Sequence, residues 1–201
     1  MSVYPKSFAL NLVFRGSRDY IQGADVYEAV VATIQGACGP VQGPLTLRMH
    51  SLARAGCELL LAPADVPVSR PELGRAEFVF GNWHGWIVET GRPVVGRLAY
   101  DEGHIARQCE ITGSIIRTIG KTPNSAIEVL IGATKLLHQS LYPQVERKWI
   151  ASRIELQRVF STTDFAMEVE LLQNLNHRLT RSAIRCAAEP LGHIFFSAIE
   201  S

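Results

Sequence analysis

Residues 25–31 read DVYEAVV, and residues 125–131 read SAIEVLI. Each run begins with a residue type that caps helices and has a glutamate three positions later, which is the capping-box spacing. A Gly-Ser pair precedes each run, at residues 16–17 and 113–114. The two stretches therefore indicate two diverged copies of one module, which we assign to residues 1–103 and 104–201.

Both runs continue as predicted amphipathic helices, because apolar residues recur at helical spacing. Pro40 and Pro143 lie just beyond the expected helix ends, where a helix is disfavoured from continuing. The residues predicted to face the core are Val26, Val30, Val31 and Ile34 in the first copy and Ile127, Leu130, Ile131, Leu137 and Leu141 in the second.

Runs rich in β-branched and aromatic residues surround each predicted helix and indicate strands. The order in each copy is one strand, the helix and then four strands, which predicts an α+β fold. The expected strands are residues 8–14, 45–52, 57–61, 77–88 and 94–100 in the first copy, and 110–119, 149–160, 166–172, 178–187 and 194–199 in the second.

This order of elements resembles the hotdog fold, in which an antiparallel sheet wraps around one long central helix. Two such modules in one chain resemble a double hotdog. The alternative is a two-domain α+β protein whose halves are unrelated.

Composition narrows the function classes. Twenty basic residues face nineteen acidic ones, for a formal net charge of +1, so no overall charge favours nucleic acid or an anionic membrane. We find neither a signal peptide nor an apolar run long enough for a membrane span, which predicts a cytoplasmic protein. The four cysteines and six histidines lack the clustered spacings of metal sites, so we expect no metal and no cofactor.

The resemblance implies an acyl-thioester substrate, carried on coenzyme A or an acyl carrier protein, near the start of a helix. Backbone N–H groups at a helix start can stabilise an oxyanion, and a nearby carboxylate can activate water. On this basis Asp19 is the leading catalytic candidate, with Gln22 orienting water or the carbonyl. Gly23 and Ala24 would supply the oxyanion contact.

Two of these assignments have structural alternatives. Glu28 is a second candidate carboxylate, but it also completes the predicted capping box with Asp25. Asp19 lies between Arg18 and Tyr20, so it could instead form an ion pair or shape a turn.

The sequence departs from two better-defined hotdog patterns. Hotdog dehydratases carry a histidine in the turn before the helix, and the turn at residues 22–24 has none. Hotdog hydratases carry an aspartate, an asparagine two residues later and a histidine three after that. Asp19 could match the first, but Ile21 and Ala24 occupy the other positions. A thioesterase is therefore favoured slightly over a dehydratase-like or hydratase-like enzyme. A non-catalytic acyl-binding or carrier-binding protein and a scaffold subunit stay open.

A second feature is the run Asn82-Trp83-His84-Gly85-Trp86. On a strand we expect both tryptophans to face one side and His84 the other. The tryptophans could line an acyl tunnel or could be core residues. The predicted substrate-binding residues are thus Tyr20, Gly23, Ala24, Trp83, His84 and Trp86. Exposed sheet edges would also permit a homo-oligomer.

Overall fold

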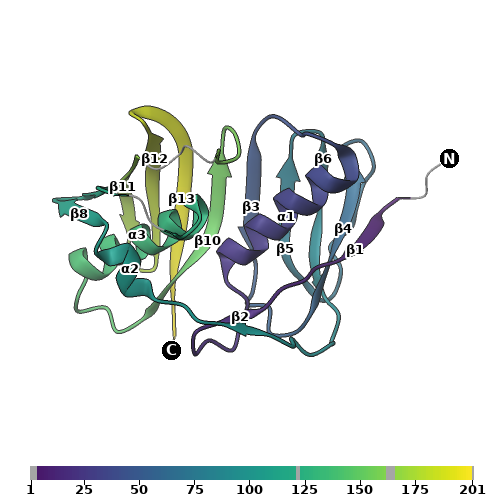
Figure 1. The fold of residues 1–201 in the computed structure, drawn as a ribbon, viewed down its shortest axis with the longest axis horizontal. Coiled ribbons are helices and arrows are strands. Elements are labelled where there is room, and N and C mark those ends of the chain that lie inside the picture. Colours follow the sequence, from purple (N-terminus) through teal and green to yellow (C-terminus); the bar gives the residue numbers. More distant parts are fainter. Residues whose placement is uncertain (1–3, 121–122, 162–165, 201) are drawn as a thin grey trace. The chain divides into compact units, whose positions relative to one another are not determined.

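The structure is a computed structural model that describes residues 4–120, 123–161 and 166–200 (Figure 1). The chain divides into two compact units, residues 1–100 (unit 1) and residues 101–201 (unit 2).

Unit 1 is an antiparallel sheet with one long helix lying across it (Figure 1). The strand order is β1-β4-β6-β5-β3, and β2 and β7 form a separate short parallel pair. The elements are β1 (Lys6–Ala9), β2 (Phe14–Arg15), α1 (Gly23–Cys38), β3 (Leu45–Met49), β4 (Cys57–Pro63), β5 (Gly74–Phe80), β6 (Trp83–Glu89) and β7 (Arg97–Leu98).

The core of unit 1 comes from the helical period on α1 and the alternating period on the strands. Val26, Val30 and Ile34 are buried as predicted, whereas Val31 is only half-buried. Each fully buried side chain of this size contributes about 1.5–3 kcal/mol. The strands present every second residue to the same core, and the most deeply buried are Leu45, Leu47, Leu59, Leu61, Phe78, Phe80 and Ile87.

Unit 2 repeats this plan with the strand order β10-β13-β12-β11-β9-β8. Its helix α3 packs against β9, β10 and β11 and against the short helix α2. The elements are α2 (Glu102–Ala106), β8 (Cys109–Thr112), β9 (Ile115–Thr118), α3 (Ala126–Leu141), β10 (Lys148–Leu156), β11 (Met167–Leu175), β12 (Leu179–Cys186) and β13 (Glu189–Ile199).

Two segments that we predicted as single strands are hairpins. Residues 77–88 are divided between β5 and β6, and residues 110–119 between β8 and β9. Gly81 and Gly113 adopt φ values of 56° and 58°, a left-handed conformation that glycine accepts without steric cost. A single such glycine reverses the chain inside a run that otherwise favours β-structure.

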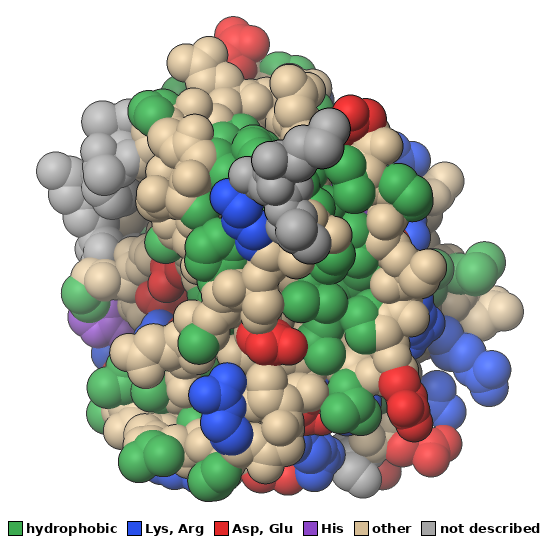
Figure 2. All heavy atoms as spheres, turned by 90° about the vertical axis from the view of Figure 1, so that its right-hand side faces the viewer, with side chains coloured by type: hydrophobic (Ala, Val, Ile, Leu, Met, Phe, Trp, Pro, Cys, Tyr) green, Lys and Arg blue, Asp and Glu red, His purple; other side chains and the backbone are tan. Residues whose placement is uncertain are grey.

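The side of unit 1 that carries β1 combines apolar and charged surface. Figure 2 shows hydrophobic side chains gathered over the middle of this face, with acidic and basic side chains interspersed along its lower part.

Candidate functional site

The two long helices differ at their N-termini. In unit 2, the Oγ atom of Ser125 accepts a hydrogen bond from the backbone N–H of Glu128 at 3.4 Å. The Glu128 carboxylate accepts one in return from the backbone N–H of Ser125 at 2.9 Å. The capping box predicted for this helix is therefore confirmed, and side chains occupy the start of α3.

In unit 1, the side chain of the N-cap residue of α1 makes no capping hydrogen bond. The N-cap residue is Gln22, and the helix begins at Gly23, so Asp25 is the third helical residue. The predicted capping box between Asp25 and Glu28 is wrong, because the helix starts earlier than that spacing implied. Glu28 instead lies in the second turn of the helix and is half-buried.

Gln22 places a hydrogen-bond donor at this uncapped helix start. Its side chain is 9% exposed, and its Nε2 atom has no hydrogen-bond partner among the described residues. Tyr20 and Ala24 are also buried, and Gly23 is half-buried. Helix-start N–H groups and an amide NH₂ attract partial negative charge, so together they suit a carbonyl oxygen or an oxyanion.

Asp25 lies in the first turn of α1 but is neutralised by an ion pair. Its Oδ1 atom lies 2.8 Å from Nε and 2.6 Å from Nη2 of Arg15, which belongs to β2. The Arg15 guanidinium also lies over the Tyr100 ring, 6.0 Å from its centroid. The first turn thus carries a carboxylate whose charge is already matched.

Asp19, the leading catalytic candidate, lies at the surface. Its side chain is 68% exposed, and its Oδ2 atom accepts a hydrogen bond from Nη1 of Arg54 at 2.7 Å. The structure thus brings Asp19 to an arginine in open solvent, while Gln22, Gly23 and Ala24 are together at the helix start. Its predicted catalytic role stays a prediction.

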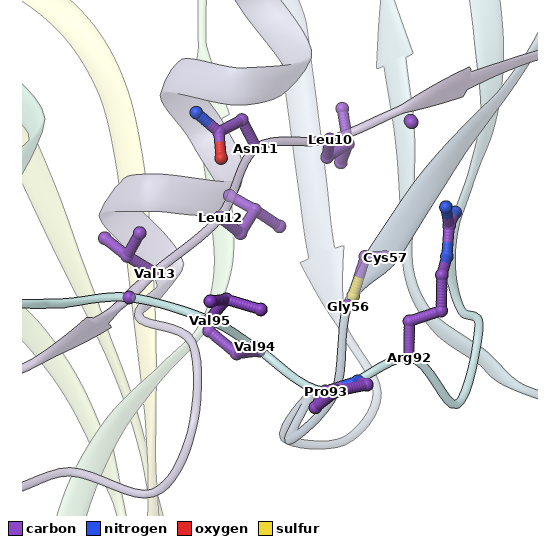
Figure 3. Close-up of a pocket in the computed structure, with 12 residues that line it drawn as sticks. Leu10, Asn11, Leu12, Val13, Gly56, Cys57, Arg92, Pro93, Val94 and Val95 are labelled. Atoms are coloured by element: carbon purple, nitrogen blue, oxygen red, sulfur yellow. The ribbon is translucent and has the colours of Figure 1, made fainter.

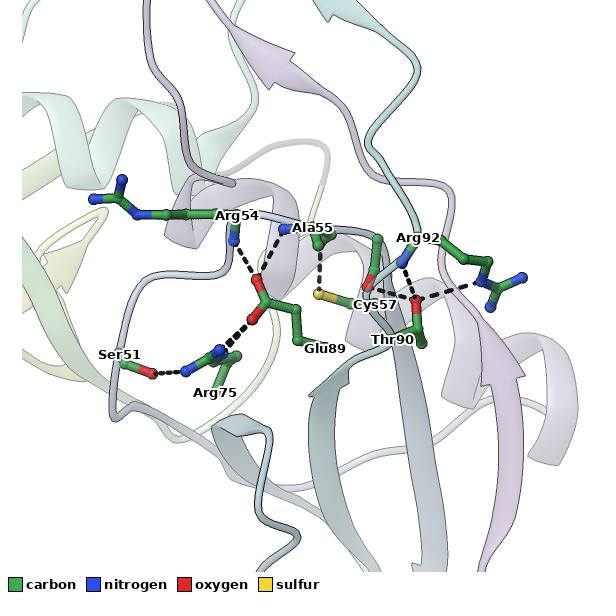
Figure 4. A network of polar contacts seen from close by, with 9 residues as sticks. Ser51, Arg54, Ala55, Cys57, Arg75, Glu89, Thr90 and Arg92 are labelled. Atoms are coloured by element: carbon green, nitrogen blue, oxygen red, sulfur yellow. Dashed lines mark hydrogen bonds and ion pairs between the residues drawn. The ribbon is translucent and has the colours of Figure 1, made fainter.

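A buried carboxylate anchors the loop that holds this segment (Figure 4). Glu89, at the end of β6, accepts hydrogen bonds from the backbone N–H groups of Arg54 and Ala55 and from the guanidinium of Arg75. The same loop accepts a bond from the segment before α1, since the N–H of Ile21 lies 2.9 Å from the carbonyl oxygen of Ala53.

The electrostatics of Glu89 follow from this network. Burial acts to raise the pKa of Glu89, but the hydrogen bonds from Arg54, Arg75 and Ala55 outweigh it and leave the pKa below its usual value. Sequence reasoning missed Glu89. An acid that ends an apolar strand was the available signal, but its partners are distant in sequence.

A pocket of about 220 Å³ opens elsewhere in unit 1 (Figure 3). It lies between residues 9–13 and residues 92–96, and Gly56 and Cys57 close one side. Apolar side chains dominate its lining, while Asn11 and Arg92 contribute polar groups. Burial, together with the Glu89 charge, raises the pKa of Cys57 to about 11, so this thiol is not a nucleophile at neutral pH.

The Trp83–Trp86 run lies on β6. Our expectation that both tryptophans share one face is wrong, because they are three residues apart and strand side chains alternate. Trp86 lies under Arg70 and is stacked on His50, whereas Trp83 contacts Tyr4. His84, on the Trp86 side, is hydrogen-bonded to the carbonyl of Val66 at 2.7 Å.

Gly85, between them, is required by close packing. A Cβ atom at this position would lie 1.7 Å from the carbonyl oxygen of Leu60 on β4.

Neither a metal site nor a membrane-spanning helix was found in the described parts of the chain. Within residues 4–120, 123–161 and 166–200, no three histidine, cysteine, aspartate or glutamate side chains are grouped to hold a metal ion. No helix among those residues has the length and apolar character that a membrane crossing requires.

Solved structures identify the fold. A proposed thioesterase II from Thermobifida fusca YX superposes with a TM-score of 0.55 and 8% identity, over 99% of this chain and 94% of that one. The dehydratase domain of PpsC from Mycobacterium tuberculosis, in complex with C12:1-CoA, superposes with a TM-score of 0.52 and 11% identity. The match covers 96% of this chain and 92% of that one. The pyran synthase domain from module nine of the sorangicin pathway superposes with a TM-score of 0.51 and 13% identity. The match covers 100% of this chain and 96% of that one.

The chain has the double hotdog fold. The fold predicted from the order of elements is therefore confirmed. No protein-family model matches the sequence of this double hotdog, and no curated protein matches it. At these identities the structural likeness concerns the fold, and the activity has to be argued from the site.

Proposed function

We propose that this double hotdog protein binds an acyl thioester, carried on coenzyme A or an acyl carrier protein, and hydrolyses it. The observation that carries the proposal is the uncapped start of α1 beside the buried, unpartnered amide of Gln22. The fold supports it, because similar structures include a proposed thioesterase and a dehydratase domain with an acyl-CoA bound.

The chemistry follows from where charge develops. When water attacks a thioester carbonyl, the carbonyl oxygen becomes negative, and donors fixed in advance stabilise it. The N–H groups of Gly23 and Ala24 and the Gln22 amide are the proposed donors. Asp19 would accept a proton from the attacking water and return it to the departing thiolate as the carbon–sulfur bond breaks.

The ion pairs of the acidic side chains favour a second candidate, a protein that binds acyl thioesters without hydrolysing them. Asp25 is matched by Arg15, and Asp19 is exposed and matched by Arg54. A general base needs a carboxylate that is free to take a proton, and an ion pair with an arginine occupies that carboxylate.

The test is thiol release from a panel of acyl-CoA and acyl-carrier thioesters by the wild type and two variants of Gln22. Gln22→Met removes the amide at nearly constant volume. Gln22→Ser adds a side chain that can cap the helix and occupy its N–H groups. Both variants should lower turnover at least tenfold, because the loss of one oxyanion donor usually lowers turnover about 100-fold or more.

Ser125→Ala is the matched control, since it changes the helix start of unit 2 and should leave turnover intact. Thioester binding without thiol release in the wild type would replace hydrolysis with the binding function. An acyl mass change of about 18 daltons, the mass of one water, would indicate a dehydratase or hydratase instead. Unchanged turnover in both Gln22 variants would remove the start of α1 from the site.

A further inference from the structure

The core of unit 2 contains a concentration of polar atoms without hydrogen-bond partners. Among the described residues, both ring nitrogens of His138, Nε1 of Trp149, Oγ1 of Thr180 and Oγ of Ser182 are buried and have no partner. None of these four residues is more than 5% exposed. They come from α3, β10 and β12, so three elements contribute to one interior.

The His138 ring contacts two aromatic side chains of the same core. The His138 ring lies 4.7 Å from the Trp149 ring and 5.1 Å from the Phe196 ring, measured between centroids. Thr180 is directly opposite Phe196 in the β12–β13 register, and Ser182 follows two residues later on the same face of β12. We call His138, Trp149, Thr180 and Ser182 the polar cluster, in which His138 contacts both Trp149 and Phe196, and Thr180 is opposite Phe196.

A dry polar cluster would be costly. Each buried polar group without a partner costs about 1–3 kcal/mol, and a whole domain is stable by only about 5–15 kcal/mol. Native proteins satisfy nearly all such groups, and internal water making two to four hydrogen bonds is the common solution. This cluster offers the required mixture, since the indole only donates, the hydroxyls donate and accept, and a neutral imidazole does one of each.

We propose that the polar cluster is an internal hydration site, in which buried water links His138, Trp149, Thr180 and Ser182. Its ligand is a neutral molecule, because burial keeps His138 uncharged and none of the other three side chains carries a charge. All four residues belong to unit 2, and the proposal does not depend on the hydrolysis proposed for unit 1.

The test counts long-lived water by oxygen-17 magnetic relaxation dispersion on the full chain. Wild type should show a buried-water contribution that falls in Thr180→Val and Ser182→Ala. Thr134→Val is the matched control, because Thr134 is equally buried but already donates to the carbonyl of Leu130 at 2.7 Å. An unchanged water contribution in both cluster variants would overturn the proposal.

The sign of the stability change gives a second test. If water links the hydroxyls, Thr180→Val removes one hydrogen-bond partner of that water and leaves the other polar groups less well satisfied. The substitution should then lower the folding equilibrium constant of unit 2 about tenfold. If the cluster is dry, the same substitution removes an unsatisfied hydroxyl and should raise that constant. A raised folding constant for both Thr180→Val and Ser182→Ala would overturn the proposal.

Discussion

The guanidinium of Arg15 donates through both Nε and Nη2 to a single oxygen, Oδ1 of Asp25, across 2.8 and 2.6 Å. The two side chains are only 17% and 8% exposed. The pair ties β2 to the first turn of α1.

Arg15→Leu should destabilise unit 1 by about 3 kcal/mol, because it removes the Arg15 charge from beside the buried Asp25 carboxylate. Chemical denaturation of the full chain measures the loss. Adding Asp25→Asn to Arg15→Leu should restore part of it, since no buried charge then remains. The matched comparison is Arg54→Leu, which breaks an exposed pair and should cost less than about 1 kcal/mol. Equal losses in the two arginine variants would contradict this account.

Asp19→Asn should keep the protein folded and lower thioester turnover by about 100-fold or more, if Asp19 is the base. Thiol release at saturating substrate measures it. Asp101→Asn is a close control, because Asp101 and Arg107 form an ion pair with exposures of 67% and 62%, against 68% and 62% for Asp19 and Arg54. Turnover that survives in Asp19→Asn would remove Asp19 from the role of base.

Ser125→Ala should lower the stability of unit 2 by about 1 kcal/mol, the usual value of an N-cap side chain. The loss should appear as faster amide hydrogen exchange in the first turn of α3. Ser114→Ala, in the exposed turn between β8 and β9, changes the same residue type outside any helix and should leave exchange there unaltered. An equal effect of the two changes would mean that the cap contributes nothing measurable.

Stability should fall as the pH drops from about 6.5 to about 4. Burial lowers the pKa of His138 to about 4, so the unfolded chain takes up this proton first and is favoured as acid is added. Above about pH 6.5, the pKa of histidine in the unfolded chain, the neutral His138 costs the folded state nothing. By pH 4 the free energy of unfolding should have fallen by up to roughly 3 kcal/mol, because each unit of difference between the two pKa values is worth about 1.4 kcal/mol.

Denaturation curves across this range, compared with those of His138→Phe, isolate this contribution because the phenylalanine cannot titrate. The variant should show a flatter dependence. His104→Gln, on the short helix α2, should keep the wild-type slope, and a wild-type slope in His138→Phe would contradict the prediction.

Local patterns were sufficient for the fold and insufficient for the details of the site. The apolar spacing around Val26 and Leu130 located both long helices, and the Ser125 cap was read correctly. The sequence could not show that Arg15 forms an ion pair with Asp25, because this contact depends on β2 and α1 being neighbours in the folded chain. For the same reason the partners of Glu89, which lie 14 to 35 residues away, could not be predicted.

The two helices are each 16 residues long, yet one begins with a completed capping box and the N-cap side chain of the other makes no capping hydrogen bond. With two similar helices in the chain, one helix start can keep its structural hydrogen bonds while the other serves the thioester binding proposed above. The tolerance of each helix start to substitution should reflect this difference. A saturation survey scored for folding alone should find position 125 restrictive and position 22 permissive, and a survey scored for function should reverse the order.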